Sequence, residues 1–427
     1  MEHAPRKLVI WLAMIALCLE LTVSANLLTA LGSHYVSDGG WLVEKLHPGS
    51  YFAAASMAAR LASGGRPSRN LWLLAWRETD LVVFLTAVAF CVLYALVMSG
   101  AGNLVALMDS FLPAGMIGVA LAGITKGDAT RMKNLLRVLF LANAWVALGE
   151  AAAGAHLLPL DPAIRELPTE FRPTALYDHP LTGSAATMLG LFLLPDPARQ
   201  PFSACAYGTC MFAALLVFGG RAALLLALLF MSAWYLSCLG QKVARRRVAP
   251  VQLAPLLIAA AAVGAAICAI LESGLGERLV AHLYWDPSAR ARLDQFQILS
   301  SLDQSQLLFG ARRVDTLALI EPLRLEYGVD VLENFWLLMF VSLGALCFTV
   351  FVAGMFAPVR WLWLRSDTPN RMMIVALLLA ASASNSLGRK STLLLILVAC
   401  VMSNTARAPA RRLVFSIGGF RSAMSGL

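Results

Sequence analysis

The stretch GVDVLENFWLLMFVSLGAL, residues 328–346, opens a long apolar run directly after an acid and an amide, Glu333 and Asn334. From residue 334 to residue 357 the chain carries no charged side chain. A helix of roughly 17 to 25 residues crosses the hydrocarbon core of a bilayer, which is about 30 Å thick. The stretch therefore predicts a membrane-spanning helix with a carboxylate at its entrance.

The composition extends this prediction to the whole chain. Of its 427 residues, 59% are hydrophobic and 14% are charged, and the mean hydropathy is +0.72, values far from those of soluble globular domains. Twelve apolar runs are expected to form spans, some of them short. They lie near residues 8–31, 50–64, 80–99, 103–122, 134–153, 181–195, 202–219, 221–240, 251–272, 334–357, 372–387 and 390–404. The sequence thus predicts an all-α polytopic membrane protein in which residues 1–427 form one integral membrane domain, and whose first run stays in the membrane and is not cleaved as a signal peptide.

The basic residues follow the positive-inside pattern. The net charge of +9 is typical of some nucleic-acid-binding proteins, but these residues lie in short loops on one side of the twelve-span arrangement, so no nucleic-acid partner is expected. They are Arg6, Lys7, Arg66, Arg69, Arg77, Lys126, Arg131, Lys133, Lys242, Arg245, Arg246, Arg247, Arg360, Arg365, Arg371, Arg407, Arg411 and Arg412. Both termini are predicted to be cytoplasmic, and two long loops, at about residues 154–180 and 273–333, to lie on the far side.

The first long loop ends in ELPTEFRPTALYDHPLTGSAATMLGL, residues 166–191. Arg172 precedes a proline, so its backbone is expected to be extended, and the side chain either has a functional role or snorkels to head groups or pairs with Glu170. His179 precedes Pro180, which can open the next helix at its first turn. By itself His179 is as well explained by capping or packing as by catalysis.

The second long loop contains apolar residues at helical spacing, which predicts an amphipathic helix over residues 288–308 at the outer membrane face. These apolar residues are Leu293, Phe296, Leu299 and Leu302. Arg290 and Arg292 stand at its start, and Arg312 and Arg313 follow Gly310. The alternative is a solvated basic loop neutralised by neighbouring acids, Asp294, Asp303 and Asp315.

Five ionisable residues within the spans, and the turn at residues 382–391, are further functional candidates. The five are Glu20, Asp109, Glu150, Arg221 and Glu272. Asp109 and Glu150 are expected to pair with a neighbouring helix or to accept hydrogen bonds from hydroxyls. The turn SASNSLGRKS leaves Arg389 and Lys390 available to an anionic head group or glycan. All eight cysteines lie inside predicted spans, which predicts small buried hydrophobes and not a disulfide framework or metal pair.

Three motifs resemble those of the O-antigen polymerase and O-antigen ligase superfamily, membrane glycosyltransferases that act on polyprenyl-linked glycans. They are RPTALYDHPLTGSA (172–185), SARARLDQF (288–296) and ENFWLLMFVSLG (333–344), in the family's order and on the predicted outer side. The ligases carry a histidine where this chain has Glu333. That departure favours the exopolysaccharide polymerase branch, in which ENFW replaces the histidine signature.

The resemblance implies a GT-C-like membrane fold and a metal-independent, inverting glycosyl transfer in the periplasm, without a cofactor. The donor would be an undecaprenyl-pyrophosphate-linked oligosaccharide in the bacterial inner membrane, and a flippase and a chain-length regulator of the same pathway are possible partners. Glu333 would be the general base, and Arg292 and Arg172 would bind the pyrophosphate. The expected substrate-binding residues are Arg221, His179, Asn334, Arg290, Arg312 and Arg313.

Two other functions and a structural interpretation of Glu333 stay open. An O-antigen ligase would share the donor chemistry and differ in its acceptor. A transporter or flippase of lipid-linked sugars would be expected to show internal repeats and broken helices, and the sequence displays neither. Glu333 itself is equally typical of an acid that complements a helix dipole.

Overall fold

The computed structural model describes residues 3–35, 41–63, 65, 67–98, 101–158, 171–197, 199–244, 293–327, 332–385, 387 and 390–405. Within these residues the regular secondary structure is entirely helical, as predicted. The α-helices are α1 His3–Thr22, α2 Ala25–Ala30, α3 Pro48–Ala62, α4 Pro67–Arg77, α5 Thr79–Met98, α6 Ala101–Leu121, α7 Lys126–Ala153, α8 Pro180–Leu191, α9 Pro201–Phe218, α10 Arg221–Ala244, α14 Ile298–Ser301, α15 Gln304–Phe309, α16 Arg313–Tyr327, α17 Phe335–Arg365, α18 Thr368–Ala383 and α19 Leu393–Thr405.

Four of these helices, α5, α7, α9 and α17, are long and apolar enough to cross a membrane. Each predicted span overlaps a helix except 251–272, which lies outside the described residues. However, α8 and α19 have 12 and 13 residues, so they extend only about 18 to 20 Å, less than a hydrocarbon core. The structure is that of an α-helical, membrane-embedded protein, and the count of twelve spans is not confirmed.

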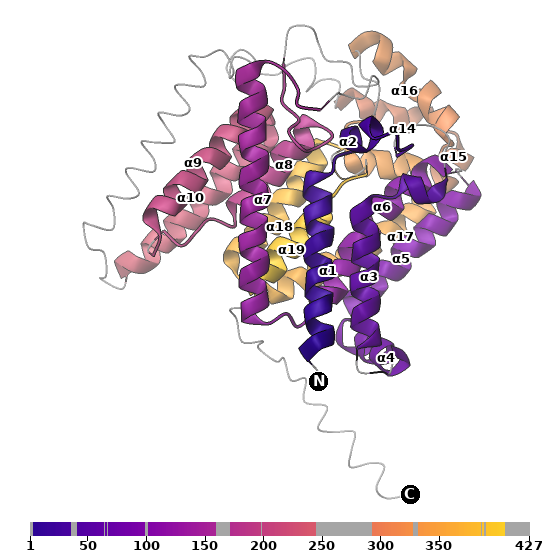
Figure 1. Cartoon of the computed structure of the whole chain (residues 1–427). Helices are drawn as coiled ribbons and strands as arrows, with labels where there is room; N and C mark the ends of the chain where they lie inside the picture. Colours follow the sequence, from indigo (N-terminus) through magenta and orange to yellow (C-terminus); the bar gives the residue numbers. More distant parts are fainter. Residues whose placement is uncertain are drawn as a thin grey trace, which may run out of the picture.

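The helices pack around α19, which lies in the middle of the bundle (Figure 1). Side chains from Leu393 to Ser403 are buried in every consecutive position, and α19 contacts α6, α7, α8, α17 and α18. A helix that is apolar all round can be surrounded by other helices in this way. On one side of α19 stand α1, α3, α5 and α6, and on the other stand α7, α8, α9 and α10 (Figure 1).

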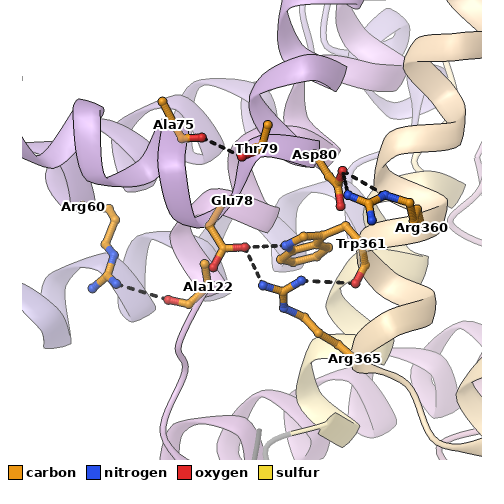
Figure 2. Close-up of polar contacts among 9 residues, drawn as sticks. All are labelled: Arg60, Ala75, Glu78, Thr79, Asp80, Ala122, Arg360, Trp361 and Arg365. Carbon is orange, nitrogen blue, oxygen red and sulfur yellow. Dashed lines mark hydrogen bonds and ion pairs between the residues drawn. The ribbon is translucent and has the colours of Figure 1, made fainter. Parts of the chain in front are cut away.

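The two ends of the bundle carry different polar groups, and we call the end at which α1 begins the basal end and the other the apical end. At the basal end the Glu78 carboxylate accepts hydrogen bonds from Arg365 Nη2 at 2.7 Å and Trp361 Nε1 at 2.5 Å. Beside it, Arg360 Nη2 lies 2.6 Å from the Asp80 carboxylate. Figure 2 shows how these groups join the start of α5 to the end of α17.

Two further guanidinium groups bind backbone carbonyls at the basal end. Arg6 donates to the Gly123 carbonyl at 2.8 Å, and Arg60 donates to the Ala122 carbonyl at 3.2 Å (Figure 2). Arg6, Arg360 and Arg365 therefore lie at one end of the bundle. This agrees with the prediction that the three residues share one side of the membrane.

The helix that begins at Phe335 is not the straight span that its sequence predicts. Gly344 interrupts α17 with φ 67° and ψ 165°. In a straight helix the rings of Phe335 and Phe351 would be about 24 Å apart, but their centroids are 6.1 Å apart. The rings of Phe340 and Phe348, closer to the bend, are 5.5 Å apart. The first part of α17 therefore folds back toward the second part.

A close approach of two glycines fixes this bend. Gly310 and Gly344 both have positive φ, 89° and 67°, and the Ala311 N–H donates to the Val341 carbonyl at 2.8 Å. A Cβ on Gly344 would lie 2.5 Å from the Leu308 carbonyl oxygen, too close for any side chain. Only glycine suits both the left-handed conformation and this packing. The expectation that broken helices are absent is therefore wrong for α17.

The predicted amphipathic helix over residues 288–308 is also corrected within residues 293–308. The chain forms a 3₁₀ turn at Gln295–Gln297 and then the short helices α14 and α15. The break comes at Leu302, whose backbone is extended, and at Asp303, whose side chain caps α15 by accepting from the Gln306 N–H at 2.7 Å. Aspartate prefers this capping position to a helix interior, which explains the interruption. Residues 288–292 lie outside the described residues.

Candidate functional site

A buried carboxylate anchors the segment that carries Arg172. Glu150, near the end of α7, accepts backbone N–H bonds from Thr174 at 2.9 Å and Ala175 at 2.8 Å, and a third from Leu157 at 2.8 Å. Glu150 does accept hydrogen bonds, as predicted, but these donors are backbone amides and not hydroxyls. Three such bonds satisfy most of the capacity of a carboxylate, so Glu150 fixes the path of the chain from residue 171 to residue 180.

Arg172 is brought to the turn between α9 and α10. Its Nε and Nη2 atoms donate to the Phe218 carbonyl at 3.3 Å and 2.9 Å. This carbonyl is at the C-terminus of α9, where a cation complements the helix dipole. Gly219 continues the turn with φ 67°, and Arg221 opens α10. Two arginines predicted from distant parts of the sequence therefore meet at one turn.

The first turn of α8 packs against the same place. His179 caps α8 through Nδ1, which accepts from the Leu181 N–H at 3.2 Å, and Pro180 is the first helical residue, as predicted. A Cβ on Gly220 would overlap Ser184 Oγ, so α8 touches the residue that precedes α10. Because helix N-termini attract anions, the two helix starts and the two guanidinium groups together favour a negatively charged ligand.

Two buried hydroxyls at this turn had no sequence signal. Tyr177 and Ser184 are 4% and 1% exposed, and neither hydroxyl has a hydrogen-bond partner among the described residues. The Tyr177 ring lies 6.2 Å from the ring of Phe218. A buried polar group left unpaired costs about 1–3 kcal/mol, so these hydroxyls are suited to meet a polar ligand or water.

Glu333 stands directly before α17, in a part of the chain that folds back into the bundle. The side chain is half-buried, and its backbone N–H donates to Gln295 Oε1 at 2.9 Å. Phe335 is fully buried, with its ring 6.3 Å from that of Phe111 in the middle of α6. Because Phe335 is only two residues away, Glu333 lies beside the packed interior of the bundle.

The turn at residues 382–391 holds the start of α17. Asn334 caps the helix through Oδ1, which accepts from the Leu337 N–H at 3.0 Å, while Nδ2 donates to the Ser382 carbonyl at 2.9 Å. Asn385 Nδ2 donates to the Leu332 carbonyl at 3.0 Å. The amide of Asn334, predicted to bind substrate, is therefore committed at both ends to the protein.

Gln295 connects the second motif to Glu333, although no sequence signal pointed to it. Its side chain is fully buried, and Nε2 has no hydrogen-bond partner within the described part of the chain. Arg290 and Arg292 lie outside the described residues. In the sequence, Arg292 precedes Gln295 by three positions.

The remaining two arginines stand at the start of α16. Arg312 is exposed and its backbone N–H donates to Asp315 Oδ2 at 3.3 Å. Arg313 opens α16, and its side chain lies outside the described residues. The structure thus places the Arg172 side chain at the turn between α9 and α10, where Arg221 is the first residue of α10. His179 caps α8, which touches that turn through Ser184, and Glu333 and Asn334 stand at the start of α17.

Within the described ranges, no group of three or more His, Cys, Asp or Glu side chains is arranged to hold a metal ion. Cys18, Cys91, Cys205, Cys210, Cys347 and Cys400 are free thiols. Comparisons of the chain with protein-family models and with curated proteins found no match. A function for the chain is therefore argued from its residues and their geometry.

Proposed function

We propose that the chain is a GT-C-like glycosyltransferase with about twelve spans in the bacterial inner membrane, and that it polymerises undecaprenyl-pyrophosphate-linked repeat units into an exopolysaccharide or O-antigen. The apical end would face the periplasm and both termini the cytoplasm. The observation that carries the proposal is the hydrogen bond from the Glu333 N–H to Gln295, because it joins the SARARLDQF motif to the ENFW motif.

The proposed reaction uses Glu333 as a general base. The Glu333 carboxylate takes the proton of an acceptor sugar hydroxyl, the hydroxyl oxygen bonds to the anomeric carbon of the donor, and the bond from that carbon to the pyrophosphate breaks. Attack from the face opposite the leaving group inverts the configuration. The pyrophosphate departs as an anion, which guanidinium groups such as those of Arg172, Arg221 and Arg292 stabilise.

The geometry at the start of α17 supports a role for Glu333 beyond complementing the helix dipole. Asn334 already caps the helix, so Glu333 precedes the cap. A negative charge at a helix start is worth only about 0.3–1 kcal/mol, so complementing the dipole would give Glu333 a small structural role. Because Asn334 supplies the cap, proton transfer by the Glu333 carboxylate would leave the start of α17 intact.

One structural feature favours a second candidate, a transporter or flippase of lipid-linked sugars. The bend of α17 at Gly344 is a broken helix, and such helices build the substrate sites of many transporters. An O-antigen ligase stays a third candidate because it would use the same donor.

Deletion of the gene, followed by analysis of the surface glycan, separates the three candidates. Single, unlinked repeats on the cell surface would support the polymerase. Full-length polymer left on its polyprenyl carrier would indicate a ligase. Repeat units retained at the cytoplasmic face of the membrane would indicate a flippase, and either of the last two results would contradict our proposal.

The orientation of the bundle gives the first prediction. Reporters fused after Leu158 and after Ser273 are expected to read as periplasmic, and a reporter fused after Arg247 as cytoplasmic, because basic loops are retained in the cytoplasm. Alkaline phosphatase and green fluorescent protein fusions provide the two complementary readouts. A cytoplasmic signal from the fusion after Ser273 would overturn both the orientation and the proposed periplasmic site.

The second prediction concerns the guanidinium groups. Arg172→Lys and Arg292→Lys are each expected to reduce polymer formation by about a hundredfold, because lysine keeps the charge but lacks the planar pair of donors that binds phosphate, and loss of one such donor costs about 3 kcal/mol in the transition state. Polymer yield and membrane abundance are measured together.

Arg137→Lys is the matched control for Arg172→Lys. Arg137 also binds backbone carbonyls at a helix end, since it donates to the Leu193 and Leu194 carbonyls at 2.6 Å and 3.2 Å. Its replacement removes a comparable structural contact at a different turn, so polymer should persist. Equal loss of polymer in both variants would show that Arg172 acts only by supporting the fold.

A further inference from the structure

A chain of polar contacts joins five residues near the apical end of α1, α3 and α6. Glu20 Oε1 lies 3.3 Å from His47 Nδ1 and 3.3 Å from Ser50 Oγ. Ser50 Oγ donates to Asp109 Oδ1 at 2.7 Å. The other oxygen of Asp109 accepts from Tyr35 Oη at 2.5 Å. Hydroxyls therefore bind Asp109, as its sequence predicts, and connect it to a second acid.

The five residues, which we call the Glu20 network, are closed off from solvent. Each of the five residues is at most 8% exposed. Neighbouring backbone encloses them tightly, because a Cβ on Gly49 would lie only 2.5 Å from Glu20 Cγ. Ionisable groups in the interior of a membrane protein are costly, and they usually mark ion or proton sites.

The charges around the network favour a proton on the His47–Glu20 pair. Asp178 lies nearby and accepts from the Ala25 N–H at 2.5 Å. Lys390 Nζ lies 3.7 Å from the centre of the Tyr35 ring and donates to the Tyr35 and Lys45 carbonyls. The charged groups of this region are the acids Glu20, Asp109 and Asp178 and the bases His47, Lys390 and Lys45, whose Nζ donates to the His34 carbonyl and whose charge acts on Lys390. Three acids thus face three bases, and the region is neutral when the His47 ring carries two hydrogens.

The two nitrogens of His47 locate the mobile proton. Nε2 lies 2.6 Å from the Val23 carbonyl, so this nitrogen carries a hydrogen. Nδ1 faces both the Gly49 N–H, at 3.1 Å, and the Glu20 carboxylate. The position between Nδ1 and Glu20 Oε1 therefore holds one proton that either group can bind.

We propose that the Glu20 network is a proton-transfer site, in which a proton shared by His47 and Glu20 passes through Ser50 to Asp109. In the first step the Nδ1–H bond of His47 breaks as an O–H bond forms on Glu20. In the second step Ser50 Oγ takes the proton of Glu20 and releases its own hydrogen to Asp109. Charge and atoms balance, since the imidazolium becomes neutral and the Asp109 carboxylate becomes a carboxylic acid. The site does not depend on the glycosyl transfer proposed above.

The ionisation of the groups outside the membrane-spanning segments agrees with this site. Burial lowers the pKa of His47, but the Glu20 carboxylate, the Val23 carbonyl and the Asp109 carboxylate together outweigh burial and raise the pKa to about 9. Burial raises the pKa of Asp178 to about 6. Because the folded-state pKa of His47 exceeds its ordinary value of 6.5, its stabilising effect is complete below about pH 6.5 and is lost as pH rises through about 9. The raised pKa of Asp178 also lowers stability with rising pH, between about 4 and about 6.

Nuclear magnetic resonance of the full-length protein in lipid nanodiscs tests the shared proton. With ¹⁵N-labelled histidine, the signal assigned by its loss in His47→Gln is expected to titrate near pH 9. In Glu20→Gln the proton affinity of His47 should fall at least tenfold, because the amide cannot offer a negative charge. An ordinary histidine titration in the wild type, unchanged by Glu20→Gln, would overturn the proposal.

Infrared spectroscopy of the same samples tests the path through Ser50. In a protein that keeps Ser50, the substitution Asp109→Asn is expected to shift the infrared band of the protonated carboxyl group of Glu20, because the two acids are coupled. In a Ser50→Ala background that effect of Asp109→Asn should disappear. Ser56→Ala is the matched control, since this buried hydroxyl of α3 donates to the Val9 carbonyl, at 2.8 Å, and not to an acid of the network. Persistence of the coupling in Ser50→Ala, as in Ser56→Ala, would overturn the relay.

Discussion

Gly344→Ala is expected to lower the free energy of unfolding by at least about 3 kcal/mol, one of the largest effects of any single methyl group in this protein. The added Cβ would lie 2.5 Å from the Leu308 carbonyl oxygen, and a backbone oxygen cannot move aside as a flexible side chain can. The left-handed conformation of residue 344 adds a cost of about 1 kcal/mol or more for a residue with a Cβ. The measurement is thermal unfolding of the purified protein in detergent.

Gly149→Ala serves as the control for this variant. Gly149 lies within α7, and no neighbouring atom lies within 4 Å of the place that an alanine Cβ would occupy. Alanine also has a higher helix propensity than glycine by about 1 kcal/mol. We therefore expect Gly149→Ala to keep or raise the melting temperature. An unchanged melting temperature in Gly344→Ala would contradict the bend and restore the straight span that the sequence predicts.

The features that follow from local sequence were predicted well. Apolar runs and the prolines that open helices are read within one segment, so the all-α class, the helix at Pro180 and its cap at His179 agree with the structure. The charge pattern correctly grouped Arg6 with Arg360 and Arg365 at one end. The runs at residues 181–195 and 390–404 were already among the short ones, and α8 and α19 are shorter still, because hydropathy does not measure how far a helix extends.

The bend of α17 could not be predicted because it depends on a contact between distant segments. Gly344 interrupts an apolar run without changing its hydropathy, and its partner Gly310 belongs to what the sequence presents as an outer loop. The Glu20 network has the same origin. Glu20, His47 and Asp109 come from separate elements, and no spacing along the chain indicates that their side chains meet.

The candidate site combines predicted and unpredicted residues. Arg172 and Arg221 were singled out by motif and by charge, but only the Phe218 carbonyl explains how they reach one turn. Gln295 was part of a quoted motif and had no assigned role. A glutamine carries little signal in a polar loop, and its importance appears only when its Oε1 is found at the Glu333 N–H.

Glu333→Gln is expected to reduce polymer formation by at least about a hundredfold, the largest effect on activity that we predict, because general bases contribute about 10² to 10⁴ in rate. The amide has the shape of the acid but cannot accept a proton at any working pH. The backbone bond to Gln295 is unaffected by this change, so membrane abundance should be normal. Polymer length and abundance are measured in a deletion strain that carries each variant.

Two other replacements at this position distinguish a base from a charge. Glu333→Asp keeps the charge but withdraws the carboxylate by about 1 Å, a displacement that can cost about a hundredfold in rate. Glu333→His supplies a different base, like that of the ligases that the motif resembles, and should retain part of the activity that glutamine lacks. If Glu333 only complemented the helix dipole, aspartate would preserve function and the cost of glutamine would be at most about 1 kcal/mol of stability.

Gln295→Ala tests whether the position of this base matters as well as its chemistry. Loss of Oε1 removes the acceptor of the Glu333 N–H and should lower polymer formation although the Glu333 carboxylate itself is unchanged. Gln297→Ala is the matched control, because the Gln297 side chain donates to the neighbouring Asp294, at 3.2 Å. A carboxylate that works as a base needs both its proton-accepting oxygen and a fixed backbone. Polymer formation should therefore fall in Glu333→Gln and in Gln295→Ala, and it should stay normal in Gln297→Ala. Wild-type polymer from Glu333→Gln at normal abundance would instead make Glu333 a structural residue.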